Sequence, residues 1–158
     1  MKSLKVYRCN ENAQLPQFSE PRSASFDIKT CLAVGTKVAT FNPWNKEVDV
    51  PIKLNNGVPT IQIHPGYRVM IPTGLSFEVD PDHVVKVYAR QELSVRHGLM
   101  FIGGVSLIDR NHTGEVFINM YNTSDGPATI SNGDIVARAM LQELEYYEFE
   151  EISELPTQ

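Results

Sequence analysis

One carboxylate stands where a strand is expected to end and a polar turn to begin. Asp109 follows the apolar run 99–108, and a turn-rich stretch then leads into a second apolar run, 116–121. Two apolar strands flanking a short polar turn predict a β-hairpin. A carboxylate at the rim of such a hairpin can accept a proton or bind a ligand hydroxyl. It can also cap the turn through its own backbone, and both readings are open at this point.

The composition fits a single domain with its own core. The 158 residues are 42% hydrophobic and 21% charged. No apolar run approaches the length of a membrane span, and no signal-type apolar segment follows the start, so we expect a soluble, cytoplasmic protein without a membrane partner. Cys9 and Cys31 lack any metal-ligand spacing, and we expect both to be buried as small hydrophobic residues rather than to bind zinc.

The charge distribution restricts the class of ligand. The net charge is −5, and acidic residues concentrate at the C-terminal end, in 143–158. Binding to a nucleic-acid backbone requires a basic stripe, so nucleic acid is an unsuitable partner. A small anionic ligand stays possible, because one nucleotide needs only two or three well-placed cations or backbone amides.

The pattern of short β-branched runs, separated by ten Gly and ten Pro, indicates an all-β barrel or sandwich. One short helix is expected at 91–97, ended by Gly98. Residues 37–60 look like an extra excursion, and 143–158 form either an arm onto a neighbouring subunit or a solvated tail. We expect one domain with its core at about 15–142. The other predicted strands are 69–79 with a break at 72–74, 84–88, 128–130 and 135–141, the last two joined by a turn at 131–134.

Four segments, in order and at matching spacing, resemble the motifs of the trimeric all-β dUTPases, a superfamily shared with the dCTP deaminases. Ala-Ser-Phe-Asp-Ile at 24–28 resembles the first motif, and Ala-Arg-Gln-Glu-Leu at 89–93 the second. The run from Gly104 to Gly114 that contains Asp109 is similar to the third motif. Gly-Asp-Ile-Val-Ala-Arg at 133–138 resembles the fourth. The likeness extends over about 15–141 and implies a distorted β-barrel or jelly roll with one short helix, assembled as a homotrimer.

The resemblance implies hydrolysis of dUTP, or a related deoxynucleoside triphosphate, to the monophosphate and pyrophosphate. It assigns Asp109 as the general base for water and Asp27 as the carboxylate that holds, through a water, the Mg²⁺ on the triphosphate. The same resemblance implies a substrate-binding set of Arg90, Gln91, Ser106, Leu107, Ile108, His112 and Arg138.

Several positions depart from the family pattern. The phosphate-binding Ser is Gln91, and the small residue after it is Glu92, whose carboxylate would repel phosphate unless it faces solvent. Where the family has a Tyr that packs under the sugar, this chain has His112. The fourth-motif Gln is Arg138, which either clamps phosphate or pairs with an acid. The expected Asn before the hairpin is replaced by the pair at 103–104.

The Gly-rich fifth motif that closes over the triphosphate is absent, because the chain after Leu141 is acidic. Drawing an acidic segment over a triphosphate costs Coulomb energy, so slow or no turnover is expected unless another segment acts as the lid. The alternative function is therefore a non-catalytic nucleotide-binding, structural or regulatory module with the same fold. A dCTP deaminase is disfavoured, because the proton-shuttling Glu of that group is Asn119 here.

Overall fold

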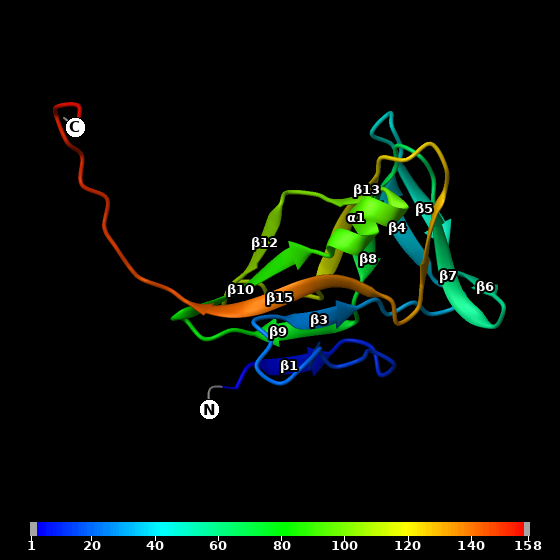
Figure 1. The fold of residues 1–158 in the computed structure, drawn as a ribbon, viewed down its shortest axis with the longest axis horizontal. Helices are drawn as coiled ribbons and strands as arrows, with labels where there is room; N and C mark the ends of the chain where they lie inside the picture. Colours follow the sequence, from blue (N-terminus) through cyan, green and yellow to red (C-terminus); the bar gives the residue numbers. More distant parts are fainter. Residues whose placement is uncertain (1–2, 157–158) are drawn as a thin grey trace.

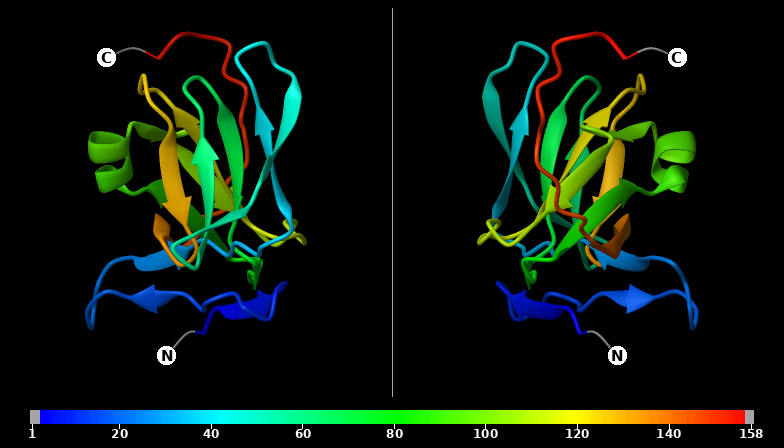
Figure 2. Two further views of the ribbon diagram at one scale, coloured as in Figure 1. Left: turned by 90° about the vertical axis from the view of Figure 1, so that its right-hand side faces the viewer. Right: turned by 90° about the vertical axis from the view of Figure 1, so that its left-hand side faces the viewer.

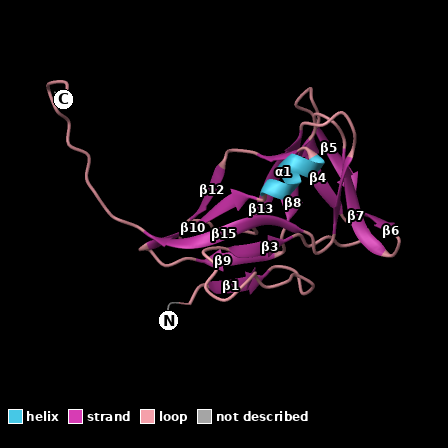
Figure 3. Cartoon of the chain, in the orientation of Figure 1, coloured by secondary structure: helices cyan, strands magenta, loops and turns pink. Residues whose placement is uncertain are grey.

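The computed structural model describes residues 3–156, which contain fifteen strands and one helix (Figure 1). Figure 3 shows how strongly strand predominates, as the all-β prediction required. The elements are β1 Lys5–Arg8, β2 Gln17–Phe18, β3 Phe26–Lys29, β4 Lys37–Phe41, β5 Glu47–Pro51, β6 Lys53–Asn55, β7 Val58–Ile63, β8 Arg68–Pro72, β9 Leu75–Glu78, β10 His83–Ala89, α1 Gln91–His97, β11 Leu99–Phe101, β12 Val105–Ile108, β13 Phe117–Asn122, β14 Ala128–Ser131 and β15 Ile135–Glu143.

The described strands form two five-stranded sheets with two smaller sheets beside them. One large sheet has the order β12-β10-β15-β3-β2, and the other has the order β11-β13-β8-β4-β5. The pairs β1-β9 and β14-β7-β6 make up the smaller sheets. Inward-facing residues of both large sheets, such as Val85, Ala137, Ile71 and Ile118, join one buried cluster, so the domain has a common core.

Alternation along β8 and β9 follows the predicted pattern. Leu75, Phe77 and Val79 are buried, whereas Glu78 and Asp80 are exposed. The predicted break falls between the two strands, at Thr73 and Gly74. Side chains that alternate across a strand place one face on the core and leave the other toward solvent, and this alternation was readable from the sequence.

The single helix has the predicted bounds. Arg90 is the N-cap, with extended backbone angles and no side-chain cap bond, and Gly98 ends the helix at φ 64°. Gly98 adopts the left-handed conformation that glycine enters without steric cost, and its N–H donates to the Leu93 carbonyl. Leu93 is the buried residue of the helix and packs it onto the core.

The predicted hairpin around Asp109 is wrong in its strand pairing. The run 99–108 is two strands, β11 and β12, separated at Ile102–Gly104. Of these, β11 pairs with β13, whereas β12 pairs with β10 in the other large sheet. Gly103 and Gly104 have φ angles of 89° and 74°, which L side chains rarely adopt. This glycine pair lets the chain turn out of one sheet and enter the other.

The turn predicted at 131–134 is present, but it too connects different sheets. Asp134 donates its N–H to the Ser131 carbonyl, and its carboxylate accepts the Ser131 N–H. The preceding strand β14 pairs with β7, and the following strand β15 pairs with β10 and β3.

Within residues 37–60, β4 belongs to a large sheet, since it pairs with β8 and buries Val38 and Thr40. The strands β5 and β6 that follow are largely exposed. The hairpin between β4 and β5 carries Trp44, which is 75% exposed. Among the described residues, no helix has the length and apolar character to cross a bilayer.

Beyond β15 the chain leaves the sheets as an extended segment that runs away from the body (Figure 1). In the side views of Figure 2 the same segment is seen in projection across the sheets. Its first residues are fastened, because the Leu144 N–H donates to the Asp82 carbonyl over 2.8 Å and the Tyr146 hydroxyl donates to the Pro81 carbonyl. Further out, Tyr147 and Phe149 are exposed and contact each other edge to face.

Candidate functional site

Asp27 and Arg138 meet on neighbouring strands of one large sheet. They are direct register partners of the β3-β15 ladder, and Arg138 is also opposite Tyr88 of β10. Arg138 Nε lies 3.3 Å from Asp27 Oδ1. The Asp27 side chain is 13% exposed and that of Arg138 is 52% exposed. The acid pairing that the sequence left as one of two roles for Arg138 is therefore present.

Arg90 lies at the end of the adjacent strand, just before α1. Its backbone is still extended, and it follows Tyr88 by two residues, so its side chain shares the sheet face of Arg138. Arg90 Nη2 lies 2.7 Å from Glu92 Oε2. The hydrogen bond and charge of Arg90 lower the pKa of Glu92, and Arg96 and His97 add to this.

The neighbouring residues of the predicted binding set differ in their exposure. Gln91 is exposed at the first helical position. On β12, Ser106 and Leu107 are exposed and Ile108 is buried. This strand is an edge strand, because in the described part of the chain it pairs with β10 alone. Its second edge therefore presents backbone N–H and C=O groups that can bind a ligand.

Asp109 caps its own turn. Its Oδ1 accepts the Asn111 N–H over 2.9 Å, and its Oδ2 accepts the Asn111 side-chain amide over 3.3 Å. The Asp109 carbonyl accepts the His112 N–H over 3.1 Å, and His112 itself is exposed. The turn-capping reading is thus realised in this chain. A carboxylate has about four lone-pair directions, so the exposed side of Asp109 can still bind a water or hydroxyl.

A single chain does not bring Asp109 to the arginines. In the β10-β12 ladder, Tyr88 is opposite Val105 and Val85 is opposite Ile108. Continuing this register places Asp109 beside Val84, six residues from Arg90, which is about 20 Å along a strand. The structure therefore assembles Asp27, Arg90 and Arg138 at one end of the sheet and leaves Asp109 at the other end of the ladder.

Glu115 was missed by the sequence reasoning, and it fixes the far end of the Asp109 loop. Its carboxylate accepts the Gly74 N–H over 2.7 Å. The Val116 N–H donates to the Leu75 carbonyl over 2.8 Å, and the Thr73 hydroxyl donates to the Val116 carbonyl over 2.7 Å. These three bonds tie the loop to the β8-β9 turn. An acid directly after Gly114 was the one visible hint of them.

The thiols depart in part from expectation. Cys31 is buried, as predicted, whereas Cys9 is exposed, because it follows β1 at the outer side of the β1-β9 pair. Both are free and line one cavity of about 370 Å³ together with Glu115. Burial, followed by the nearby Glu115 carboxylate, raises the pKa of each thiol.

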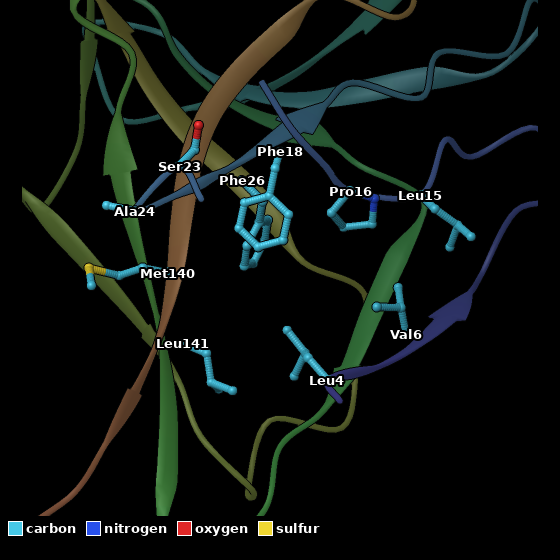
Figure 4. Close-up of a pocket in the computed structure, with 10 residues that line it drawn as sticks. All are labelled: Leu4, Val6, Leu15, Pro16, Phe18, Ser23, Ala24, Phe26, Met140 and Leu141. Carbon is cyan, nitrogen blue, oxygen red and sulfur yellow. The ribbon is translucent and has the colours of Figure 1, made fainter. Parts of the chain in front are cut away.

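An apolar pocket of about 650 Å³ lies between the N-terminal segment and β15. Figure 4 shows Leu4 and Val6 on one side of it and Met140 and Leu141 on the other. The described residues that line it carry no ionisable side chain. None of Asp27, Arg90, Asp109 and Arg138 is among the described residues that line this pocket.

The carboxylates of the described residues do not form a protein cage for a metal, since residues 3–156 contain no cluster of three His, Cys, Asp or Glu with suitable placement. Mg²⁺ commonly binds through one or two carboxylates plus waters and substrate phosphates. Asp27, a largely buried carboxylate on the sheet face that also carries Arg90 and Arg138, fits that mode of binding.

The chain matches the family model described as dUTPase over residues 58–158. It is 35% identical over 95 residues to a deoxyuridine 5'-triphosphate nucleotidohydrolase of Finegoldia magna, covering 60% of this chain and 66% of that protein, just under two thirds of the relative's length. A second such protein, from Ectopseudomonas mendocina, is 30% identical over 135 residues, covering 85% of this chain and 73% of the relative.

Solved structures share the fold at low sequence identity. A mutant of the Staphylococcus bacteriophage 80alpha dUTPase with dUpNHpp has a TM-score of 0.74 at 16% identity, over 99% of this chain and 92% of that one. A mutant dUTPase from phage phi11 of S. aureus, described with a structural Mg(II) ion, has a TM-score of 0.74 at 16% identity, over 99% and 100% of the two chains. The match of the family model to more than half of the sequence, together with these relatives, shows that the chain belongs to the dUTPase family.

Proposed function

We propose that this protein hydrolyses dUTP, or a closely related deoxynucleoside triphosphate, to the monophosphate and pyrophosphate through metal-assisted attack of water. The observation that carries the proposal is the grouping of Asp27, Arg90 and Arg138 on one sheet face of a dUTPase-family chain. The relatives are named nucleotidohydrolases of deoxyuridine 5'-triphosphate, and one structural neighbour was solved with dUpNHpp.

The two arginines supply the charge that phosphate binding needs. A guanidinium binds phosphate oxygens through two parallel N–H donors, which makes it a stronger anchor than the amide expected at position 138. Arg90 and Arg138 share a face and stand on neighbouring strands, so one phosphate chain can reach both. Their role in the proposed reaction is to hold the phosphates and offset the developing charge.

The base and the phosphate-binding groups come from different copies in the proposed assembly. Asp109 lies about 20 Å along the ladder from Arg90 within one chain, which is too far for both to contact one nucleotide. We therefore assign Asp109 of one subunit to the Asp27, Arg90 and Arg138 face of a neighbour, in a homotrimer. Asp109 activates the water, and the free backbone edge of Ser106–Ile108 reads the base.

Mg²⁺ bound with the nucleotide would reduce the negative charge on the phosphates. Asp27 would hold it through a water. This carboxylate is largely buried and pairs with Arg138, so its direction is restricted before substrate binds.

The second candidate is a non-catalytic nucleotide-binding module, and three observations favour it. Both arginines are paired with acids, and both oxygens of Asp109 bind Asn111. The acidic C-terminal segment also lacks the glycines of a phosphate lid. A deaminase is not favoured, because Asn119, exposed on β13, has no titratable group.

The test incubates purified protein with magnesium and each deoxynucleoside triphosphate in turn, and follows pyrophosphate release. Release from dUTP that is lost in Asp109→Ala, but kept in Asp125→Ala as a control at an exposed loop aspartate, supports hydrolysis. No release from any nucleotide, with thermal stabilisation by dUTP, supports the binding module. A monomer on size exclusion that shows no response to any nucleotide contradicts both.

A further inference from the structure

Each guanidinium of the proposed phosphate site is already occupied by a carboxylate of its own chain. Arg138 pairs with Asp27 over 3.3 Å, and Arg90 pairs with Glu92 over 2.7 Å. The four charges cancel in two pairs. A phosphate chain that approaches this face therefore meets little net positive charge and must compete for each guanidinium.

The Glu92 carboxylate competes with the nucleotide phosphates for Arg90. Its pKa is lowered, first by the hydrogen bond and charge of Arg90 and then by Arg96 and His97. The lowered pKa favours the ionised carboxylate at neutral pH, where the nucleotide phosphates are also charged. The second motif of the dUTPases has a small residue at this position, so the acid is a departure of the present chain from that motif.

The exposures of the two partners show which of them can move. The Arg90 side chain is 27% exposed, and that of Glu92 is 48% exposed. Arg90 directly follows β10, which ends at Ala89, whereas Glu92 stands in the first turn of a seven-residue helix. Surface ion pairs of this kind are weak. The carboxylate can therefore rotate into solvent while the guanidinium keeps its place on the sheet.

We propose that Glu92 is a displaceable counter-ion of Arg90 that sets the affinity of the site for the nucleotide's phosphate chain. Binding of the phosphates expels the Glu92 carboxylate from Arg90, and this competition weakens binding without touching the reacting atoms. The inference rests on the proposed function. It makes Glu92 an affinity-determining residue, and Arg90 the group through which it acts.

The experiment measures binding of dUpNHpp to the 158-residue chain by isothermal titration calorimetry in the presence of magnesium. Glu92→Gln is expected to tighten binding roughly three- to fivefold, since an exposed pair is weak. Glu47→Gln removes the same charge from exposed β5 and is expected to leave binding unchanged. The decisive arm is Arg90→Ala, in which the additional change Glu92→Gln should have no effect.

Four outcomes overturn the inference. Binding by Glu92→Gln that is no tighter than by Glu47→Gln excludes competition. If Glu92→Gln tightens binding equally in the wild-type and the Arg90→Ala backgrounds, the effect is one of general charge. If Glu92→Gln alone binds dUpNHpp more weakly than the wild type, Glu92 orients Arg90 for the phosphate. If the wild-type protein neither binds dUpNHpp nor hydrolyses dUTP, both the proposed function and the inference about Glu92 are overturned. If the wild type binds dUpNHpp but the Glu92 variants do not behave as expected, only the inference about Glu92 fails.

Discussion

Arg90 and Asp109 flank the same strand pair but stand at its two ends. The β10-β12 register places one beside the glycine turn at Gly103 and Gly104, and the other beside Val84. In the proposed homotrimer, each chain thus carries the phosphate-binding half of one site and the base-bearing half of another. Completing either site then requires a second copy of the chain.

Mixed assemblies test this division of the site. Arg90→Ala and Asp109→Ala proteins should each be inactive toward dUTP. When the two are denatured together and refolded as mixed trimers, about a quarter of the sites should regain both groups. Pyrophosphate release by the mixture, compared with each variant refolded alone, provides the measurement. A mixture as inactive as its components would show that one chain supplies the whole site.

Replacing Arg138 with Gln removes one phosphate anchor and releases Asp27 from its partner. The KM for dUTP should rise about tenfold, because a charged hydrogen bond is lost, while kcat changes less. Stability should fall by about 1–3 kcal/mol, since the largely buried Asp27 carboxylate loses its partner. Steady-state kinetics and urea unfolding measure both effects.

Lys37→Gln is the matched control for this change. It breaks another cross-strand ion pair, Lys37 with Asp49 at 3.2 Å, on a different sheet. Its KM should equal that of the wild type. A comparable rise in KM in the control would argue that lost surface charge, rather than lost phosphate contact, explains the Arg138 result.

Glu115 should matter for catalysis without contacting the substrate. Glu115→Ala removes the acceptor of the Gly74 N–H, so we expect a loss of about 1–3 kcal/mol in the free energy of unfolding. It should also lower kcat, since the Asp109 loop loses one of its anchors. Glu115→Gln keeps an acceptor oxygen and should restore most of both quantities. A kcat for Glu115→Ala equal to that of the wild type would refute the anchoring role.

Thiol reactivity provides a pH-dependent test of the Glu115 cavity. The pKa of Cys9 and that of Cys31 are raised by burial and then by Glu115, so thiolate is scarce at neutral pH. Alkylation should be slow there, accelerate at alkaline pH, and modify exposed Cys9 before buried Cys31. Glu115→Gln should accelerate it, as followed by peptide mass spectrometry.

The raised pKa values of Cys9 and Cys31 also make the free energy of unfolding depend on pH. A thiol whose folded pKa is raised adds stability that is fully present below its unfolded pKa and is lost as pH rises through the folded value. The free energy of unfolding of the wild type, measured in urea, should therefore fall at alkaline pH. This fall in the free energy of unfolding should be smaller in Cys31→Ser, where the buried thiol is absent.

Local features were predictable because local chemistry determines them. Gly98 ends the helix at the predicted residue because only glycine enters a left-handed cap readily, and Leu75 and Phe77 face inward because a strand alternates. Strand partners were not predictable, because they depend on residues far apart in sequence. Gly103 and Gly104 were visible in the sequence, yet their effect, a change of sheet, depended on β10 offering a free edge to β12.

The candidate site shows the same division. The family motifs identified Asp27, Arg90 and Arg138, but their grouping on one face follows from the register of β3, β15 and β10. The pairing of Arg90 with Glu92 was equally hidden. Repulsion between Glu92 and phosphate was expected from residue type, whereas the structure shows the acid paired with a cation that we propose binds phosphate.

The strand β10 joins the two half-sites within each chain, and this has a genetic consequence. A distortion of β10 displaces Arg90 at one end and β12 with Asp109 at the other. In the proposed homotrimer, one defective subunit therefore damages two active centres that it shares with normal neighbours. A destabilising allele in this strand should act as a dominant-negative when it is expressed with the normal chain.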